Sequence, residues 1–311
     1  MAKEIDIICV GEALIDFIGE QKEAPINETK DYHRYLGGSP TNVAMNMSRL
    51  GAKVQMVATV GKDGFGDYIL KRLKEAEVST DYLLETSEKP TSVIFVNRTT
   101  GTPEFIAYRG ADTLISEAQL PLELLKKTKI YHTTCFALSK NPARETILSK
   151  AKEAYKAGCQ LSIDINYSEK IWPNTQAAKK AIETYCNYQP LIKISQDDVD
   201  RLFGKGMTHD EVFSHLHELG AKLVCFTLGK DGAKLSEKGK LKISLPALKV
   251  EKIMDATGAG DAFWSGFLFT YVKGKTPEQC MEVALKMAAI KLQNVGRIPD
   301  YTNLISKILH L

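Results

Sequence analysis

Short runs of β-branched and other apolar residues alternate with amphipathic stretches along most of this chain, and this alternation limits the folds that it can adopt. Strands are predicted at 5–11, 53–61, 129–134, 159–166, 190–195 and 222–229, and helices between them at 39–50, 64–77, 142–157, 174–187 and 209–219. Strands that alternate with helices form βαβ units around a mainly parallel sheet. The continuous apolar character of the runs fits strands that are covered on both faces. We therefore expect an α/β fold.

Two segments break this rhythm. Residues 12–36 and 90–112 contain strand-like pieces, such as SVIFVNR and PEFIAYR, without an intervening helix. Such strands can form a flap beside the ligand crevice of an α/β domain, and an ordinary edge hairpin fits the pattern equally well. The chain has no low-complexity linker and no internal repeat. We therefore predict a single domain over 1–311, with a small lid formed by about 12–36 and 90–112.

The composition excludes several classes of protein. A formal net charge of +3 in 311 residues is too weak to make nucleic acid or a membrane surface the main partner. The six cysteines stand singly, without the spacing of a zinc site, which is typical of a reducing compartment. No apolar stretch approaches membrane-spanning length, and the N-terminus lacks the apolar core of a signal peptide. We expect a cytoplasmic protein.

The segment DATGAGDAFWSGFL at 255–268 is the most informative part of the sequence. Gly258, Ala259 and Gly260 precede an apolar run that reads as a buried helix, so the helix should begin at these small residues. Its exposed N–H groups and its dipole would favour a phosphate or a developing oxyanion. Asp261 lies in the first turn and is placed to accept a proton. A helix cap after a tight turn is the alternative, and it would be preferred for an isolated GxGD.

This segment resembles the second signature of the PfkB, or ribokinase, family of carbohydrate kinases. The first signature of that family resembles Gly37-Gly38-Ser39-Pro40-Thr41-Asn42-Val43-Ala44, followed by Leu50-Gly51 and 60–66. The resemblance spans essentially the whole chain. It implies a ribokinase-like three-layer αβα domain with a β-strand lid, and ATP-dependent phosphorylation of a sugar hydroxyl.

The resemblance also implies roles for residues around 255–261. Asp261 would be the catalytic base, and the backbone of Gly258, Ala259 and Gly260 would form the anion hole. Asp255 and Thr257 would contribute to a monovalent-cation site for K⁺, completed by backbone near Asn294 and Gly296.

The substrate and nucleotide residues are implied in the same way. The substrate residues are Asp16, Gly37, Gly38, Asn42, Arg109 and Asn166. The nucleotide residues are Lys193, Thr227, Gly229, Gly232 and Asn294. Local chemistry alone allows other interpretations: a turn before a helix capped by Ser39 with Pro40 at its first position, and a plain strand–turn–strand at 227–232.

One family motif is altered. Many members carry Asn-x-x-Glu, which organises water bound to Mg²⁺, where this chain has Ser195-Gln196-Asp197-Asp198. Asp198 is a shorter substitute for the glutamate and is the implied Mg²⁺ residue. A helix N-cap followed by an acidic first turn fits these residues equally well.

The segments at 108–112 and 164–172 resemble those of fructokinases and 2-keto-3-deoxygluconate kinases, and fructose is the expected acceptor. Ser168 stands where 2-keto-3-deoxygluconate kinases usually, and fructokinases often, carry an arginine suited to a substrate carboxylate, so a sugar acid is less favoured than a neutral sugar. Ketodeoxygluconate, ribose and nucleosides are the alternative acceptors, and a non-catalytic sugar-binding module is a further alternative. A nucleotide-cofactor oxidoreductase and a P-loop kinase are disfavoured, because the first strand is not followed by GxGxxG and the chain has no GxxxxGK[ST]. A homodimer through the lid strands is expected from the tendency of exposed strand edges to pair.

Overall fold

The computed structural model describes residues 3–99, 103–296 and 298. Residues 100–102 of the predicted lid and both ends of the predicted 1–311 domain lie outside the described residues. Within the described part of the chain, no helix combines the length and apolar character that a membrane span requires.

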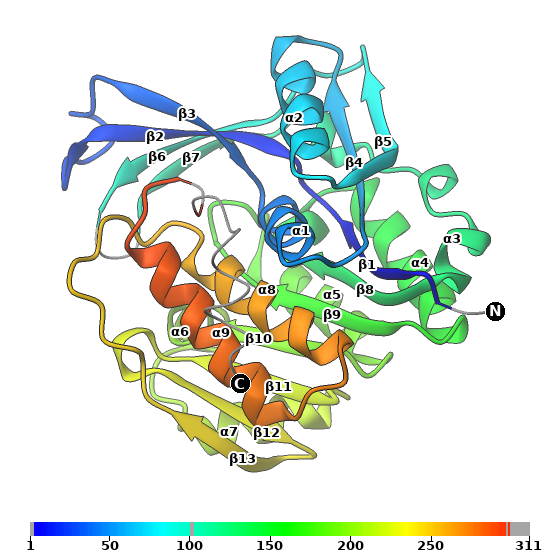
Figure 1. Ribbon diagram of the computed structural model, residues 1–311, viewed down its shortest axis with the longest axis vertical. Coiled ribbons are helices and arrows are strands. Elements are labelled where there is room, and N and C mark those ends of the chain that lie inside the picture. The colour runs from blue at the N-terminus through cyan, green and yellow to red at the C-terminus, as the bar shows by residue number, and fades with distance from the viewer. Residues whose placement is uncertain (1–2, 100–102, 297, 299–311) are drawn as a thin grey trace.

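In the described residues, a nine-stranded sheet forms the centre of the molecule, in the order β13-β12-β11-β10-β9-β8-β1-β4-β5 (Figure 1). The strands from β11 to β5 pair in parallel, and β12 and β13 add an antiparallel edge. The strands are β1 (Ile5–Val10), β4 (Val54–Gly61), β5 (Ser79–Thr86), β8 (Thr128–Thr134), β9 (Gln160–Ile165), β10 (Leu191–Ser195), β11 (Leu223–Thr227), β12 (Ala233–Glu237) and β13 (Lys240–Leu245). The six predicted strands are therefore confirmed as part of a mainly parallel sheet.

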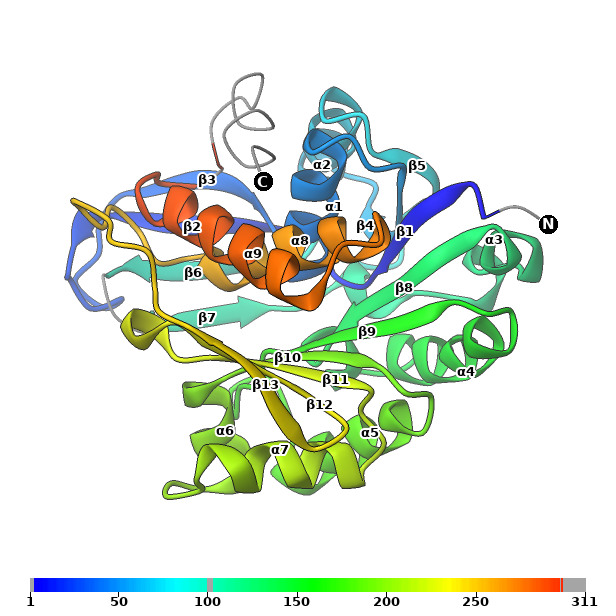
Figure 2. The same ribbon diagram turned by 60° about the horizontal axis from the view of Figure 1, so that its bottom comes forward.

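Helices cover both faces of this sheet, which gives the predicted three layers (Figure 2). One layer holds α1 (Ser39–Arg49), α2 (Gly64–Glu75), α8 (Ala259–Val272) and α9 (Pro277–Leu292). The other holds α3 (Leu122–Lys126), α4 (Ala143–Lys156), α5 (Thr175–Cys186), α6 (Gln196–Phe203) and α7 (His209–Glu218). Each layer has its own apolar core against the sheet. The five predicted helices are confirmed to within two residues at their ends.

The two segments that break the α/β rhythm form a separate four-stranded sheet in the described residues, in the order β3-β2-β6-β7. Its strands are β2 (Leu14–Lys22), β3 (Tyr32–Gly37), β6 (Val93–Arg98) and β7 (Phe105–Tyr108). This small sheet projects from the body of the molecule beside α1 and α9 (Figure 1). Because β3 leads directly into α1, the sheet and the N-terminus of that helix are positioned together.

Candidate active site

The glycine-rich loop before α8 has the backbone geometry predicted for an anion site. Gly258 is the N-cap of α8 and adopts the left-handed conformation, with φ 76° and ψ 7°, which favours glycine. The first N–H groups of a helix have no partners within it, and the helix dipole adds positive charge there. Residues Ala262–Thr270 of the same helix are buried, as predicted, so this N-terminus is fixed by the core behind it.

Asp261, in the first turn of α8, is held by two donors from the first turn of α1. Its Oδ1 accepts a hydrogen bond from Ser39 Oγ at 2.7 Å, and its Oδ2 accepts one from Asn42 Nδ2 at 2.8 Å. The alternative interpretation of a turn followed by a helix describes the backbone here, but its cap residue is wrong, because Gly38 and not Ser39 is the N-cap of α1. The Ser39 hydroxyl is thereby available to Asp261, and the N-termini of two helices meet at this carboxylate.

Asp16 lies on β2, close to the glycine loop that precedes α1. A Cβ atom on Gly37 would collide with the Asp16 carboxylate, so the glycine permits this close approach. Burial, together with the nearby carboxylates of Asp261 and Asp255, raises the pKa of Asp16 to about 7. Asp16 therefore changes between a proton donor and an acceptor near neutral pH.

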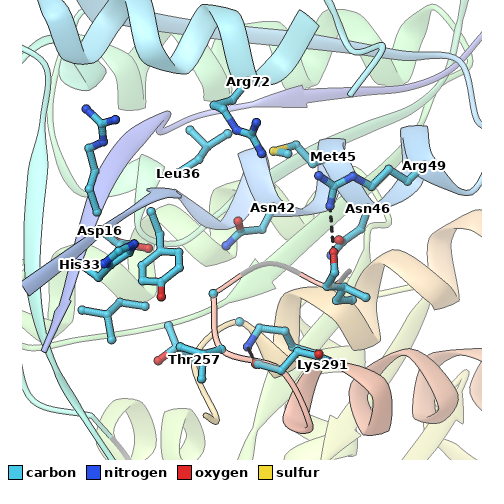
Figure 3. Close-up of a pocket in the computed structure, with 18 of the residues that line it drawn as sticks. Asp16, His33, Leu36, Asn42, Met45, Asn46, Arg49, Arg72, Thr257 and Lys291 are labelled. Atoms are coloured by element: carbon cyan, nitrogen blue, oxygen red, sulfur yellow. Dashed lines mark hydrogen bonds between the residues drawn. The ribbon is translucent and has the colours of Figure 1, made fainter. Parts of the chain in front are cut away.

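Asp16 and Asn42 both line a pocket of about 500 Å³ between the small sheet, α1, α2 and the end of α9 (Figure 3). Gly258 and Thr257 of the glycine-rich loop also line it. The volume suits a small ligand such as a sugar. Two of the predicted substrate residues and the glycine-rich loop thus border one space.

Arginines form the wall of this pocket opposite the loop. Arg34, Arg49 and Arg72 all line it, and Figure 3 shows Arg49 and Arg72 on the same side as α1 and α2. The Arg34 guanidinium lies over the Tyr68 ring, 4.0 Å from its centroid, and Arg72 pairs with Glu75. These contacts orient the guanidinium groups at the rim of the cavity.

Lys193 approaches the loop from the sheet side. It lies directly across from Asp164 in the register of β9 and β10, and its Nζ is 3.1 Å from Asp164 Oδ2. A Cβ atom on Gly260 would lie 2.8 Å from this Nζ, so the ammonium contacts the backbone of the glycine-rich loop at 258–260, called the anion loop below. Burial lowers the pKa of Lys193, but the carboxylates of Asp164 and Asp198 outweigh it and the net shift is upward. The lysine therefore presents a fixed positive charge to the loop.

The other predicted nucleotide residues fall in two places. Thr227 ends β11, and Gly229 and Gly232 form the turn between β11 and β12. Asn294 follows α9 and instead lines the pocket that contains Asp16. The hairpin interpretation of 227–232 therefore describes the backbone, and the nucleotide role stays a prediction.

Asp198 caps α6 with Ser195. The Ser195 hydroxyl accepts from the Asp198 N–H at 3.2 Å, and Asp198 Oδ2 accepts from the Ser195 N–H at 3.3 Å, which is a capping box. The buried Asp164 carboxylate faces the Lys193 ammonium with both oxygens, and its Oδ1, 3.0 Å from that ammonium, has no further donor among the described residues. The described residues contain no ready-made metal cluster of three or more His, Cys, Asp or Glu side chains. This donor set fits Mg²⁺, which usually binds one or two carboxylates together with substrate phosphates.

The predicted K⁺ site holds a side chain of the protein itself. Lys291 Nζ lies 3.3 Å from Asp255 Oδ2 and 3.0 Å from the backbone oxygen of Asn294. Thr257 contributes its N–H to Asp255 Oδ1 at 3.0 Å. The residues present therefore do not fit a K⁺ ion at this position.

Four predicted substrate residues lie outside the lining of this pocket. Gly37 ends β3 and Gly38 is the N-cap of α1, and the other two are Arg109 and Asn166. Arg109 donates to Asp112 at 2.6 Å and to Ser139 at 2.8 Å, and its guanidinium lies 4.1 Å from the Phe136 ring centroid. Asn166 Oδ1 accepts from the Phe136 N–H at 3.0 Å. Both side chains organise the turn after β8, and a substrate contact stays a prediction.

Sequence reasoning missed Glu12 and Lys291. Burial raises the pKa of Glu12 to about 8, and its carboxyl accepts from the Ser39 N–H at 3.1 Å, which helps to fix α1. A signal existed for Lys291, since it follows the apolar run Met287–Ile290 near the end of a helix. A lysine in such a run requires a buried partner.

A carboxylate in the first turn of a helix, hydrogen-bonded to a residue that lines a pocket and preceded by a glycine loop that also lines it, is the arrangement of an enzyme that transfers an anionic group. A profile described as pfkB family carbohydrate kinase matches residues 4–303. An ATP-dependent 6-phosphofructokinase of Thermoanaerobacterium thermosaccharolyticum is 37% identical over 298 residues, which cover 96% of this chain and 91% of the relative. The probable fructokinase-5 of Arabidopsis thaliana is 34% identical, covering 88% of this chain and 85% of the relative.

The solved structure of Halothermothrix orenii fructokinase superposes with a TM-score of 0.78 at 31% identity, covering 94% of this chain and 100% of that chain. This chain belongs to the pfkB family of carbohydrate kinases. The predicted ribokinase-like fold is confirmed. As a member of the family it is a phosphotransferase with an alcohol group as acceptor, and its small-molecule partners are ATP and a sugar.

Proposed function

We propose that this chain transfers the γ-phosphate of ATP to a hydroxyl group of fructose, with Asp261 as the base. The observation that carries the proposal is the position of Asp261, which lies in the first turn of α8 and is hydrogen-bonded to Asn42 in the wall of the pocket. A hydroxyl in this pocket reaches the carboxylate by replacing one of its two present donors.

In the proposed reaction, the sugar oxygen forms a bond to the γ-phosphorus while the bond to the departing ADP oxygen breaks. The hydroxyl proton passes to Asp261 and then to water. The amides of 258–260 and the Lys193 ammonium stabilise the negative charge of the transferred group, which is the main task of a protein in phosphoryl transfer.

ATP is proposed to bind over the carboxyl ends of β10 and β11, with its phosphates at Lys193 and its other groups near Thr227, Gly229 and Gly232. When bound, Mg²⁺ neutralises charge on the phosphate oxygens. Asp164 and Asp198 are the carboxylates available to hold it, directly or through water.

The acceptor is proposed to bind Asp16 and the 37–42 loop. A carboxylate accepts hydrogen bonds from two hydroxyls, and an amide side chain both donates and accepts. The fructokinase names of the Arabidopsis and Halothermothrix relatives favour fructose.

A second candidate acceptor is a fructose that already carries a phosphate. The specific observation in its favour is the wall of Arg34, Arg49 and Arg72, because guanidinium groups bind phosphate through paired hydrogen bonds. Along α1, seven residues separate Asn42 from Arg49, a rise of about 10 Å. That span suits a hexose with its reacting hydroxyl at one end and a phosphate at the other. The first relative described above is named a 6-phosphofructokinase.

The test is ATP consumption, read as ADP formation, against fructose, fructose 6-phosphate, ribose, glucose, ketodeoxygluconate and adenosine. We expect turnover with fructose or fructose 6-phosphate, and a loss of about 100- to 10,000-fold in Asp261→Asn. The matched control is Asp210→Asn, an exposed aspartate in the first turn of α7. No turnover with any acceptor, or equal turnover in Asp261→Asn, would reject the proposal.

The arginine wall separates the two acceptors. If the phosphorylated sugar is the substrate, Arg72→Gln lowers kcat/KM for fructose 6-phosphate by about 10- to 100-fold and leaves that for fructose unchanged. Lys71→Gln, an exposed change one residue away on α2, is the control. An unchanged kcat/KM for both sugars would favour fructose, and equal losses for both would indicate general distortion of the pocket.

We also propose that the small sheet acts as a lid over the sugar and that two copies of the chain form a homodimer through it. Ile106 and Tyr108, on the edge strand β7, are 44% and 61% exposed, which suits pairing of two lids in a homodimer. Light scattering of the purified protein and of an Ile106→Lys variant would test this. Residues 12–36 and 90–112 are proposed to close over the sugar within one 1–311 domain, and the protein is proposed to act in the cytoplasm.

A further inference from the structure

Lys291 is an unusual residue for the interior of a helix layer. Only 4% of its surface is exposed, and it extends from the last turn of α9 toward the loop before α8. Its ammonium contacts a carboxylate oxygen of Asp255 and the backbone oxygen of Asn294. A charged side chain is buried in this way only when its charge is compensated.

Asp255 is completely buried and has a full set of partners. Its Oδ1 accepts from the Thr257 N–H at 3.0 Å, and its Oδ2 accepts from Lys291 and, at 3.4 Å, from the Gly296 N–H. A carboxylate and backbone carbonyl oxygens are the ligands that a hard monovalent cation would use. Here an ammonium group occupies that position among the described residues.

The same lysine touches the anion loop. A Cβ atom on Gly258 would lie 3.6 Å from Lys291 Cε, so the lysine stem packs against the glycine whose left-handed conformation begins α8. Lys291 therefore ties the end of α9, through Asp255 and Gly258, to the backbone that receives the transferred phosphoryl group. Figure 3 shows its side chain beside Thr257 at the edge of the pocket.

We propose that the Lys291 ammonium is a built-in substitute for a monovalent cation, so that turnover does not depend on K⁺. The proposal rests on the kinase function proposed above and makes Lys291 a positioning residue, because it acts through the loop and not on the reacting atoms. A second monovalent cation about 4 Å from the ammonium would lose about a thousandfold in affinity by charge repulsion. Lysine and K⁺ therefore exclude one another.

The first test compares ADP formation by the unaltered protein in K⁺, Na⁺ and tetramethylammonium salts at equal ionic strength. We expect rates that agree within about twofold, since the salts differ only in the cation. An activation of tenfold or more by K⁺ would overturn the proposal, because a cation would then bind in addition to Lys291.

The second test uses two variants with opposite predictions. Lys291→Met removes the charge but keeps the bulk, so we expect kcat to fall about 10- to 100-fold, with no recovery in K⁺. Lys291→Ala removes both charge and bulk, so we expect a similar loss that K⁺ reverses and tetramethylammonium does not. Lys286→Met, on the same helix and outside the pocket lining, is the control. Equal behaviour of Lys291→Ala in all three salts would overturn the proposal.

A third measurement does not need turnover. The thermal midpoint of Lys291→Ala should rise on adding KCl in place of tetramethylammonium chloride, and that of the unaltered protein should not. This readout separates a failure of the cation proposal from a failure of the kinase proposal, because it stays informative if no acceptor sugar is phosphorylated. A thermal midpoint of Lys291→Ala that is insensitive to K⁺ would count against the proposal that Lys291 takes the place of a monovalent cation.

Discussion

Two buried lysine–aspartate pairs flank the anion loop, and they are built differently. Lys193 and Asp164 lie side by side on β9 and β10 and contact the loop at Gly260. Lys291 and Asp255 link α9 to the segment before α8 and contact the loop at Gly258. One pair therefore supports the loop from the sheet and the other from the helix layer.

The two pairs differ in how completely their carboxylates are satisfied. Both oxygens of Asp164 face the Lys193 ammonium, at 3.0 and 3.1 Å, and Oδ1 has no further donor among the described residues. Burial raises the pKa of Asp164 to about 7, helped by Asp261 and Asp198. Asp255, besides Lys291, accepts from two backbone donors, the Thr257 N–H at Oδ1 and the Gly296 N–H at Oδ2. A buried carboxylate whose described contacts on one oxygen are limited to a lysine has lone pairs left for a ligand, and one that backbone donors also hold is suited to supporting the structure. We infer that Lys193 and Asp164, the sheet-side pair, bind the phosphates. Lys291 and Asp255, the helix-side pair, instead hold the loop in place.

Removing the charge of the sheet-side lysine should have the largest effect on catalysis. Lys193→Met should lower kcat by about 100- to 1000-fold, since it removes a positive charge next to the transferred group. Single-turnover kinetics would measure it, with Lys242→Met on the exposed edge strand β13 as control. A loss confined to the KM for ATP would show that Lys193 only binds the nucleotide.

Replacing each aspartate in turn should show which of the two pairs contributes more to the free energy of unfolding. Asp255→Asn should lower the free energy of unfolding by about 3 kcal/mol, because it leaves Lys291 buried without its counter-charge. Asp164→Asn should cost less than about 1 kcal/mol, because Lys193 still faces Asp198 and Asp261. Urea denaturation would measure both. The reverse order of the two losses would contradict the division of roles.

A change on the sugar side should leave both pairs intact. Gly37→Ala forces the Asp16 carboxylate to move, so the KM for the acceptor should rise about tenfold while the KM for ATP stays constant. Initial rates with each substrate varied in turn would measure this. Gly51→Ala is a stability control at a distant turn, where no atom lies within 4 Å of the added Cβ, although its φ of +86° adds backbone strain. A parallel rise in both KM values would indicate general distortion.

Asp164 of the sheet-side pair should also contribute to the pH dependence of the free energy of unfolding. Asp164 has an ordinary pKa of 3.8 and a folded-state pKa of about 7. Between these values the unfolded chain has released the proton that the folded chain retains, so the free energy of unfolding should fall as pH rises. Asp164→Asn should flatten this slope in urea titrations of the ligand-free protein. An unchanged slope would place the effect in Asp16 and Glu12, whose pKa values are also raised.

Local sequence patterns were sufficient to predict most of the fold. The apolar runs predicted the parallel strands, and the small residues at 258–260 predicted where α8 begins, because both features depend on neighbours in sequence. The lid strands were also visible, since they interrupt the alternation of strands and helices. The added edge strands β12 and β13 were not predicted in full, because short polar strands resemble turns.

The contacts that assemble the site were harder to predict. Ser39 and Asp261 are 222 residues apart, and Lys291 and Asp255 are 36 apart, so no local spacing relates them. Ser39 has the residue type of a helix cap, and only the backbone of Gly38 shows that the cap lies one residue earlier. Asp261 itself was predicted from its loop, but the partners that hold it depend on how two helices pack.

The two hydrogen bonds that Asp261 receives from Ser39 and Asn42 also bear on what the protein does when no sugar is present. A lone water molecule would have to break one of these bonds, and it cannot fill the pocket or contact Asp16 at the same time. An acceptor sugar offers all of these contacts together. If Asp261 acts as proposed, we expect slow ATP hydrolysis in the absence of sugar, so that a cell rich in ATP but short of sugar would lose little of that ATP through this protein.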